Sequence, residues 1–309
     1  MWLNRQRGFT LIELLVCLAV GGLVAAFMTA TLVRQQRFYS SASAALDTRA
    51  QLRDAADVLG TDIRSAAIGL GVPVMRDTAI ELFTVIASSV VCTTASATSF
   101  GLPPLVLASG HTLTSMLALP DTGDLALVYT MPPAAPDSGS WETRRTMGFV
   151  PKEVSLACPQ STGFTAPADA ASGHPAYHAT IELPTVDPAR AGAPIHFVRR
   201  ARYSIYRSSD NRWYLGYRRC NAKGPSACAA IQPVSGPYYA SSAGSFGITF
   251  RYFDHDGVEL PSGSSSDGLA RVDFVVRGKS ARNLDLAGDA RSTFRDSVIM
   301  SVSPRNRFR

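Results

Sequence analysis

The sequence predicts an α+β protein in which one long N-terminal helix leads into a β-rich, mostly antiparallel globular head. Residues 9–68 are first almost wholly apolar and then amphipathic, with apolar side chains three and four residues apart. After residue 72, several segments alternate apolar and polar side chains, which is typical of strands. With 309 residues, 46% of them hydrophobic, the chain can form one large domain or two modest ones.

Residues 9–33 predict a membrane-spanning helix. At about 1.5 Å per residue they would form a helix roughly 38 Å long, enough to cross a bilayer with some tilt. A core helix of a soluble domain seldom stays apolar on every face for so long. The exceptions in this run are Thr10, Glu13, Thr29 and Thr31.

Glu13 is the charged residue inside this apolar run. The Leu, Ile, Val and Phe side chains of residues 9–33 together favour insertion by roughly 4–8 kcal/mol, and one charge opposes it by roughly 2.5–3.5 kcal/mol at the bilayer centre. Insertion is still favoured, but many apolar residues would serve better. A carboxylate within the membrane is therefore predicted to be a functional site with a partner.

The segment does not fit an ordinary secretory signal peptide. Such a signal has a shorter apolar core and a cleavage site of small residues after it. Here the apolar core is too long, although Ala25 and Ala26 lie within it, and the available break point is Gly8, which precedes the core.

Residues 8–16, GFTLIELLV, resemble the class III signal of type IV prepilins and type II secretion pseudopilins. The resemblance implies that a prepilin peptidase cleaves between Gly8 and Phe9 and methylates the new N-terminus of Phe9. Residues 1–8 would be a cytoplasmic leader. The protein would then be a single-pass inner-membrane protein with a periplasmic head, and it would join a pilus or pseudopilus after assembly.

Cleavage would also explain Glu13. It creates a cationic amine on Phe9, four residues before Glu13, and residues four apart share one helix face. A lone amine or a lone carboxylate among packed apolar helices is unfavourable. The resemblance favours pairing with the amine of a neighbouring subunit, which makes Glu13 an assembly residue. Many major pilins carry a proline in the apolar run; this chain has Gly21 and Gly22 there instead.

Residues 34–68 predict an amphipathic continuation of the helix that packs on the head, and the signal stops at Gly69 and Pro73. This is the lollipop layout of pilins, with the globular domain over residues 72–309. The strand candidates are Ile80–Ile86, Asp124–Thr130, Tyr177–Leu183, Ile195–Arg207, Arg212–Arg219, Phe246–Phe253, Ala270–Arg277 and Ser297–Val302. The head loosely resembles PilW-type minor pilins and J-type minor pseudopilins.

Five cysteines are present, and Cys17 lies in the apolar run. In an oxidising compartment the other four predict two disulfides, for which three pairings exist. We favour Cys220–Cys228, which closes a short loop, together with Cys92–Cys158. A four-cysteine zinc site is disfavoured because no C-x-x-C pair occurs.

No metal or cofactor site is expected. His174 and His178 are four residues apart, but the chain there predicts a strand, so they do not form a helical metal pair. Asp254 and Asp256 fit a hairpin turn better than a calcium loop, because the position two residues earlier is Tyr252. No nucleophile or phosphate-binding motif is found, so an enzyme is not expected.

Aromatic and arginine residues gather between residues 199 and 219, and the net charge is +6. They are Tyr203, Tyr206, Trp213, Tyr214 and Tyr217 with Arg199, Arg200, Arg202, Arg218 and Arg219. Such a set can bind nucleic acid. We favour two adjacent strands with the aromatic residues on one face and the arginines on the other.

The sequence thus predicts a structural subunit, a minor pilin or minor pseudopilin that primes or caps filament assembly. Its expected partners are the prepilin peptidase, other minor subunits, the major subunit and the inner membrane. Type IV pilus, type II secretion and DNA uptake all remain open as the machine it serves. The alternative function is a tip-displayed adhesion or DNA-binding module on the same anchor, and a third is a membrane-anchored periplasmic enzyme.

Overall fold

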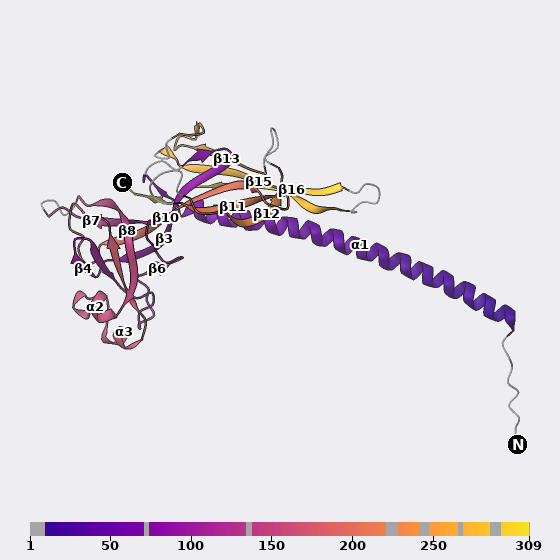
Figure 1. The fold of residues 1–309 in the computed structure, drawn as a ribbon, viewed down its shortest axis with the longest axis horizontal. Helices are drawn as coiled ribbons and strands as arrows, with labels where there is room; N and C mark the ends of the chain where they lie inside the picture. The colour runs from indigo at the N-terminus through magenta and orange to yellow at the C-terminus, as the bar shows by residue number, and fades with distance from the viewer. Residues whose placement is uncertain are drawn as a thin grey trace, which may run out of the picture. The chain divides into compact units, whose positions relative to one another are not determined.

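The computed structural model describes residues 10–70, 74–133, 138–220, 228–240, 247–264, 268–284 and 292–308. It confirms the predicted α+β class, since one long apolar helix is followed by strands that pair almost entirely antiparallel (Figure 1). Gly8 and Phe9 lie outside the described residues.

Helix α1 spans Leu11–Arg64, so it ends four residues before the predicted Ile68. Residues Ala67–Ile68 instead form strand β1, which pairs in parallel with β17, Asn306–Arg307. The Arg305 amide donates to the Arg64 carbonyl at 3.0 Å, and the Asn306 side chain donates to the Ser65 carbonyl at 3.0 Å. The C-terminal segment thus takes up carbonyl groups that a helix end leaves unpaired.

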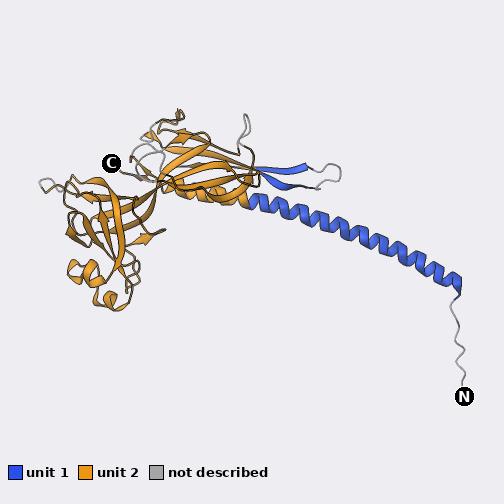
Figure 2. Ribbon diagram, in the orientation of Figure 1, with its two compact units in different colours: residues 1–50, 279–296 blue, residues 51–278, 297–309 orange. Residues whose placement is uncertain are grey.

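The chain divides into two compact units (Figure 2). The first contains residues 1–50 and 279–296, and the second contains residues 51–278 and 297–309. In the first unit Arg49 pairs with Asp296 at 3.0 Å and lies over the ring of Phe294. The second unit contains most of the strands and the last turns of α1.

Fifteen strands within the described residues belong to one hydrogen-bonded network. The long strands are β3 (Ala79–Val90), β7 (Leu125–Thr130), β8 (Ser140–Lys152), β9 (Ala176–Ile181), β10 (Pro194–Arg207), β11 (Trp213–Cys220), β12 (Gln232–Tyr238), β13 (Ile248–Phe253), β15 (Arg271–Leu284) and β16 (Ser292–Val302). The short ones are β2 (Met75–Arg76), β4 (Thr93–Ser96), β5 (Ser99–Leu102), β6 (Ser115–Met116) and β14 (Glu259–Leu260). Short helices occur at α2 (Val154–Ala157), η1 (Gln160–Thr162) and α3 (Pro167–Ala171).

Strand β10 connects two large clusters of buried apolar side chains. Its C-terminal half contributes Ala201 and Tyr203 to a cluster that also contains Leu52, Leu59 and Ile63 of α1. Its N-terminal half contributes Ile195 and Phe197 to a second cluster, formed with β3, β5, β7 and β9. Burial of the helix stripe on the sheet agrees with the predicted amphipathic pattern.

All eight predicted strands are present, and two other long strands were missed. Strand β8 is half-exposed along most of its length and carries charged residues on both faces, so it lacks the apolar alternation of a strand signal. Strand β12 contains Pro233 and Pro237, which normally argue against a strand.

Two disulfides occur in the structure, Cys92–Cys158 and Cys220–Cys228. They are the two bridges favoured from the sequence. Cys17 is not bridged, and its side chain is exposed on α1.

Candidate functional site

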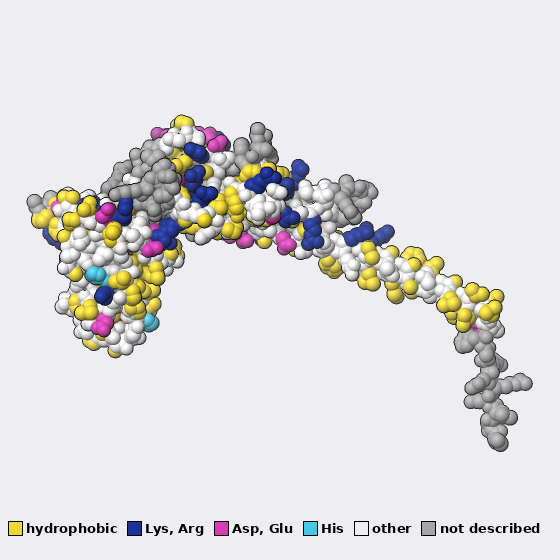
Figure 3. Space-filling model, viewed as in Figure 1, with side chains coloured by type: hydrophobic (Ala, Val, Ile, Leu, Met, Phe, Trp, Pro, Cys, Tyr) yellow, Lys and Arg dark blue, Asp and Glu magenta, His cyan; other side chains and the backbone are white. Residues whose placement is uncertain are grey.

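The first turns of α1 present apolar side chains that none of the described residues covers. All side chains from Thr10 to Ser40 are exposed, and Leu11, Leu18 and Phe27 retain 79%, 67% and 68% of their accessible surface. Figure 3 shows this run of hydrophobic side chains along the helix. Within the part of the chain that the structure describes, α1 is the helix that is long and apolar enough to cross a membrane.

Polar side chains in this run are mostly satisfied by the helix itself. The hydroxyl of Thr29 donates to the Ala25 carbonyl at 2.7 Å, and that of Thr31 donates to the Phe27 carbonyl at 2.9 Å. A hydroxyl bonded to the carbonyl four residues earlier is tolerated in an apolar environment. Glu13 is different, because its charge cannot be neutralised in this way.

Glu13 and Thr10 form a capping box at the start of α1. The Glu13 amide donates to the Thr10 hydroxyl at 3.3 Å, and the Thr10 amide donates back to Glu13 Oε2 at 2.9 Å. The Thr10 hydroxyl also donates to Glu13 Oε2 at 3.0 Å. These bonds satisfy amides that a helix start leaves without partners, and the carboxylate lies where the helix dipole favours negative charge.

One carboxylate oxygen of Glu13 remains available. The bonds from Thr10 all go to Oε2, and no group among the described residues donates to Oε1. A carboxylate has about four acceptor positions in total. Glu13 can therefore hold the helix start and accept a cationic donor at the same time.

Thr10 was not singled out from the sequence, although a signal for it exists. A Thr followed three residues later by Glu, directly before an apolar run, is the sequence pattern of a capping box. Gly8 and Phe9, the predicted processing residues, are not among the described residues, so their geometry relative to Glu13 stays a prediction.

Two of the residues considered for metal binding, His178 and Asp254, have other partners. The His178 ring contacts the Ser99 hydroxyl at 2.7 Å within a strand pair. Asp254 accepts the amides of Asp256 and Val258 at 3.0 and 2.8 Å, which is the hydrogen bonding of a turn. In the described ranges no three potential ligands lie together as a metal site would require.

The aromatic and arginine residues of β10 and β11 are arranged differently from the prediction. The strands are adjacent, but each face carries both residue types. Register pairs Tyr203 with Tyr217 and Ala201 with Arg219 on one face, and Arg202 with Arg218 and Tyr206 with Tyr214 on the other. The predicted separation of aromatic residues from arginines was wrong, because side chains three residues apart in a strand lie on opposite faces.

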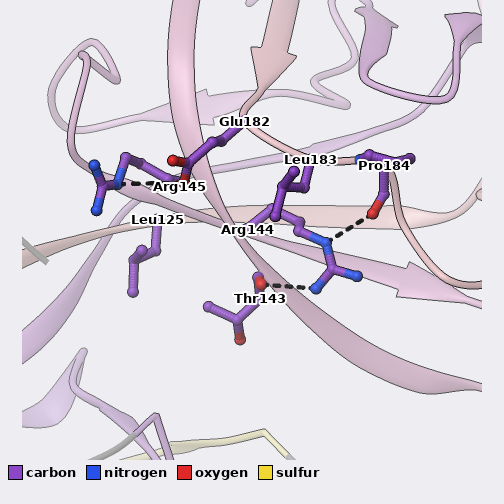
Figure 4. A pocket seen from close by; sticks show the side chains of 7 residues that line it. All are labelled: Leu125, Thr143, Arg144, Arg145, Glu182, Leu183 and Pro184. Atoms are coloured by element: carbon purple, nitrogen blue, oxygen red, sulfur yellow. Dashed lines mark hydrogen bonds and ion pairs between the residues drawn. The ribbon is translucent and has the colours of Figure 1, made fainter. Parts of the chain in front are cut away.

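A pocket of about 520 Å³ lies beside strand β8 (Figure 4). Arg144 points across it and donates to the Pro184 carbonyl at 3.0 Å, while Arg145 pairs with Glu182 at 3.7 Å. Arg144 also pairs with Glu142, which accepts the amides of Val186 and Asp187. Both cations are thus already engaged with groups of the chain itself.

Comparison with known proteins identifies the N-terminal segment. Residues 3–29 match the family model described as the prokaryotic N-terminal methylation motif. No curated protein and no solved structure matches the chain significantly.

The match includes Gly8, Phe9, Glu13 and most of the apolar run. The N-terminus therefore carries the class III signal of a type IV pilin-like protein. This signal implies processing by a prepilin peptidase and association with pilus or pseudopilus components. Together with the apolar helix, it fits a membrane-anchored structural protein.

Proposed function

We propose that this chain is a minor pilin or minor pseudopilin of the PilW or J type, a structural subunit that primes or caps filament assembly. In this proposal residues 1–8 are the leader, residues 9–33 form the membrane and filament-core helix, and residues 34–68 continue it into the head. Residues 72–309 form the periplasmic domain.

The observation that carries the proposal is the uncovered start of α1. Its side chains from Leu11 to Val33 are exposed, and Glu13 is the charged residue among them. Exposed Leu and Phe side chains each leave roughly 1.5–3 kcal/mol of burial unrealised. A bilayer covers this surface before assembly, and neighbouring helices cover it in a filament.

Glu13 then sets the register of that packing. Its Oε2 atom holds the first turn of the helix, and its Oε1 atom accepts the methylated amine of a neighbouring Phe9. A misplaced subunit would leave both charges unpaired in an apolar environment, which is strongly unfavourable. A buried polar pair that fixes register is a well-established use of such groups.

The first test is the intact mass and N-terminal sequence of the protein, expressed with and without a prepilin peptidase. We expect a chain that begins at Phe9 and is heavier by one methyl group only when the peptidase is present. A chain that still begins at Met1 in both preparations would contradict the proposal.

The second test separates processing from assembly. Glu13→Gln keeps the size of the side chain and removes its charge, so we expect normal cleavage at Gly8 but loss of incorporation into filaments. Thr31→Val is the matched control, because it removes a polar group from the same helix without removing a charge. Equal incorporation of both variants would contradict the role of Glu13.

A DNA-binding function is a second candidate, and one observation favours it. Arg202 and Arg218 lie directly opposite each other, although like charges in that position are unfavourable. Glu81, the register partner of Arg202 on β3, pairs with Arg200 instead. Tyr206 and Tyr214 share this face, so phosphate and base contacts could both be made.

Duplex and single-stranded DNA binding, measured over a range of salt concentrations, tests this candidate. Replacing both Arg202 and Arg218 by Ala should weaken binding and lower the slope against log salt by roughly 1–2. Arg251→Ala is the control, because Arg251 is exposed and paired with Glu259. Absence of salt-dependent binding by the unaltered chain would exclude this function.

A further inference from the structure

The last turn of α1 carries an acidic side chain that lines a pocket of the second unit. The pocket has a volume of about 320 Å³ and lies between α1 and strands β3, β10, β11 and β12. Its polar lining residues are Asp62, Thr84, Arg199, Tyr203, Tyr217 and Gln232, and Leu117 is among its apolar lining residues. This volume lies near the lower limit for small-molecule sites and can hold the end of one long side chain.

Asp62 is in an unfavourable position for a carboxylate. It lies two residues from the C-terminal end of α1, where the helix dipole disfavours negative charge. Burial raises its pKa, and a hydrogen bond from the Tyr203 hydroxyl partly offsets that effect. Over the described segments, no Lys or Arg pairs with its carboxylate.

The cations near Asp62 are engaged elsewhere. Arg199 binds both carboxylate oxygens of Asp124, at 3.0 and 2.7 Å, and donates to the Leu119 carbonyl at 2.9 Å. Arg219 binds Asp121 at 3.0 Å and Asp124 at 3.1 Å. These two arginines and two aspartates balance one another, so neither of these arginines is left to compensate the charge of Asp62.

Two tyrosine rings flank this charge. The centroids of Tyr203 and Tyr217 lie 5.4 Å apart, and their rings are tilted by 53°. Aromatic rings next to a carboxylate form an environment that attracts a cation by ion pairing and by cation–π interaction. A neutral or anionic ligand would leave the charge of Asp62 without a counter-ion.

The rim of the pocket indicates which kind of molecule carries the cation. Leu117 lines the pocket, and its side chain is 79% exposed. Leu119 lies two residues further along the same segment, and its side chain is 63% exposed. Neighbouring exposed apolar side chains beside a pocket favour contact with a protein partner over binding of a free polar metabolite.

We propose that this pocket receives a basic side chain, arginine or lysine, from a partner protein, with Asp62 as its counter-ion and Leu117 and Leu119 as apolar contacts. The pocket lies in the head and its test requires no filament. The proposed interaction can therefore be tested independently of N-terminal processing.

The test uses the full chain in detergent, with ¹³C-labelled tyrosine. The probe is the peptide acetyl-Leu-Arg-Leu-amide, and its matched neutral form has citrulline in place of arginine. We expect the arginine peptide to shift the Tyr203 and Tyr217 signals and to bind at least tenfold more tightly than the citrulline peptide. Equal binding of the two peptides would overturn the proposal.

Variants locate the interaction. Asp62→Asn should weaken the arginine peptide at least tenfold, whereas Asp57→Asn, an exposed acid on the same helix, should leave binding within twofold. Unchanged binding by Asp62→Asn would show that Asp62 only anchors Tyr203. If Asp62→Asn does not fold, Gln232→Lys provides the second test. A lysine at this position should pair with Asp62 and prevent binding of the peptide.

A final comparison identifies the source of the cation. N-acetylarginine methylamide has the same guanidinium group without the leucines. The tripeptide should bind at least threefold more tightly, because Leu117 and Leu119 contact its apolar side chains. Equal affinity for both compounds would indicate a site for small cations and would overturn the assignment to a partner protein.

Discussion

Residues 11–33 and residues 52–63 belong to the same helix, yet their surroundings differ completely. In the first segment each side chain is exposed, including Leu18 at 67% and Phe27 at 68%. In the second segment Leu52, Leu59 and Ile63 are at most 1% exposed and pack into the first core cluster of the head. The sequence predicts this difference, because the first segment is apolar on nearly every face and the second carries an apolar stripe between charged residues.

The difference indicates what packs against each segment. The second segment buries one stripe against strands of its own chain, so the chain itself stabilises it. The first segment is apolar on nearly every face, and none of the described strands packs against it, so we expect its partners to be the membrane or other molecules. Mutations should therefore affect folding in one segment and assembly in the other.

The largest effect should come from Leu59→Ala. Leu59 is fully buried, and truncation of such a leucine lowers the free energy of unfolding by about 3–5 kcal/mol through lost burial and an unfilled cavity. Leu18→Ala, the matched change in the first segment, should leave unfolding of the head unchanged. Denaturant unfolding of the full processed chain, followed by tryptophan fluorescence of the head, measures both.

Equal destabilisation by Leu59→Ala and Leu18→Ala would contradict the difference between the two segments. It would show that the first segment also packs on the head and that its exposed surface does not need an external partner.

A smaller effect is expected at the start of the helix. Thr10→Val removes the hydroxyl that accepts the Glu13 amide, and loss of an N-cap costs about 0.5–2 kcal/mol. Thr10→Ser keeps the hydroxyl and should behave like the unaltered chain. Hydrogen exchange of the Glu13 amide in detergent measures the change, and equal exchange in the two variants would show that the cap does not stabilise this turn.

The sequence predicted those parts of the molecule that depend on local pattern. The apolar run, the methylation motif and the alternating strands are all periodic or contiguous signals, and each occurs where it was expected. Strand β12 was missed because Pro233 and Pro237 hide a strand whose pairing comes from distant segments. The capping box at Thr10 was readable from T-x-x-E and was overlooked.

The strand face on which each side chain lies and the contacts in the head pocket were harder to predict from the sequence, for different reasons. Strand alternation alone places Tyr203 and Tyr206, three residues apart, on opposite faces, so the predicted aromatic face was inconsistent with the predicted strand. The contact between Asp62 and Tyr203 joins residues 141 positions apart. No local pattern signals it, because it depends on how the helix end docks on the sheet.

Glycine substitutions in the two segments should change the stability of the helix by a smaller amount. A Cβ atom on Gly22 would have no neighbour within 4 Å, so Gly22→Ala should stabilise the helix by about 0.5–1 kcal/mol. A Cβ atom on Gly60 would lie 3.3 Å from the end of Met300, so Gly60→Ala should gain less. Hydrogen exchange across each site measures both, and a larger gain at Gly60 would contradict the packing there.

The smallest effect concerns Asp62 and depends on pH. Burial raises the pKa of Asp62 above its ordinary value, so the folded protein binds this proton more tightly than the unfolded chain. The contribution of Asp62 to stability is therefore most favourable below pH 3.8 and declines as the pH rises through the raised pKa. Asp62→Asn keeps an acceptor for Tyr203 and removes the charge, so it should raise the Tm slightly at pH 7, with the gain vanishing toward pH 4.

Asp57→Asn is the control, because Asp57 is exposed on the same helix and should change the Tm little at either pH. A Tm of Asp62→Asn that is lower than that of the unaltered chain at pH 7 would mean that the charge already has a stabilising partner within the chain. The expected result is instead a variant that is more stable but binds the arginine peptide more weakly. A carboxylate that lowers the stability of the isolated chain and is needed for binding is the behaviour expected of an interaction site, since functional groups are often held in positions that do not favour folding.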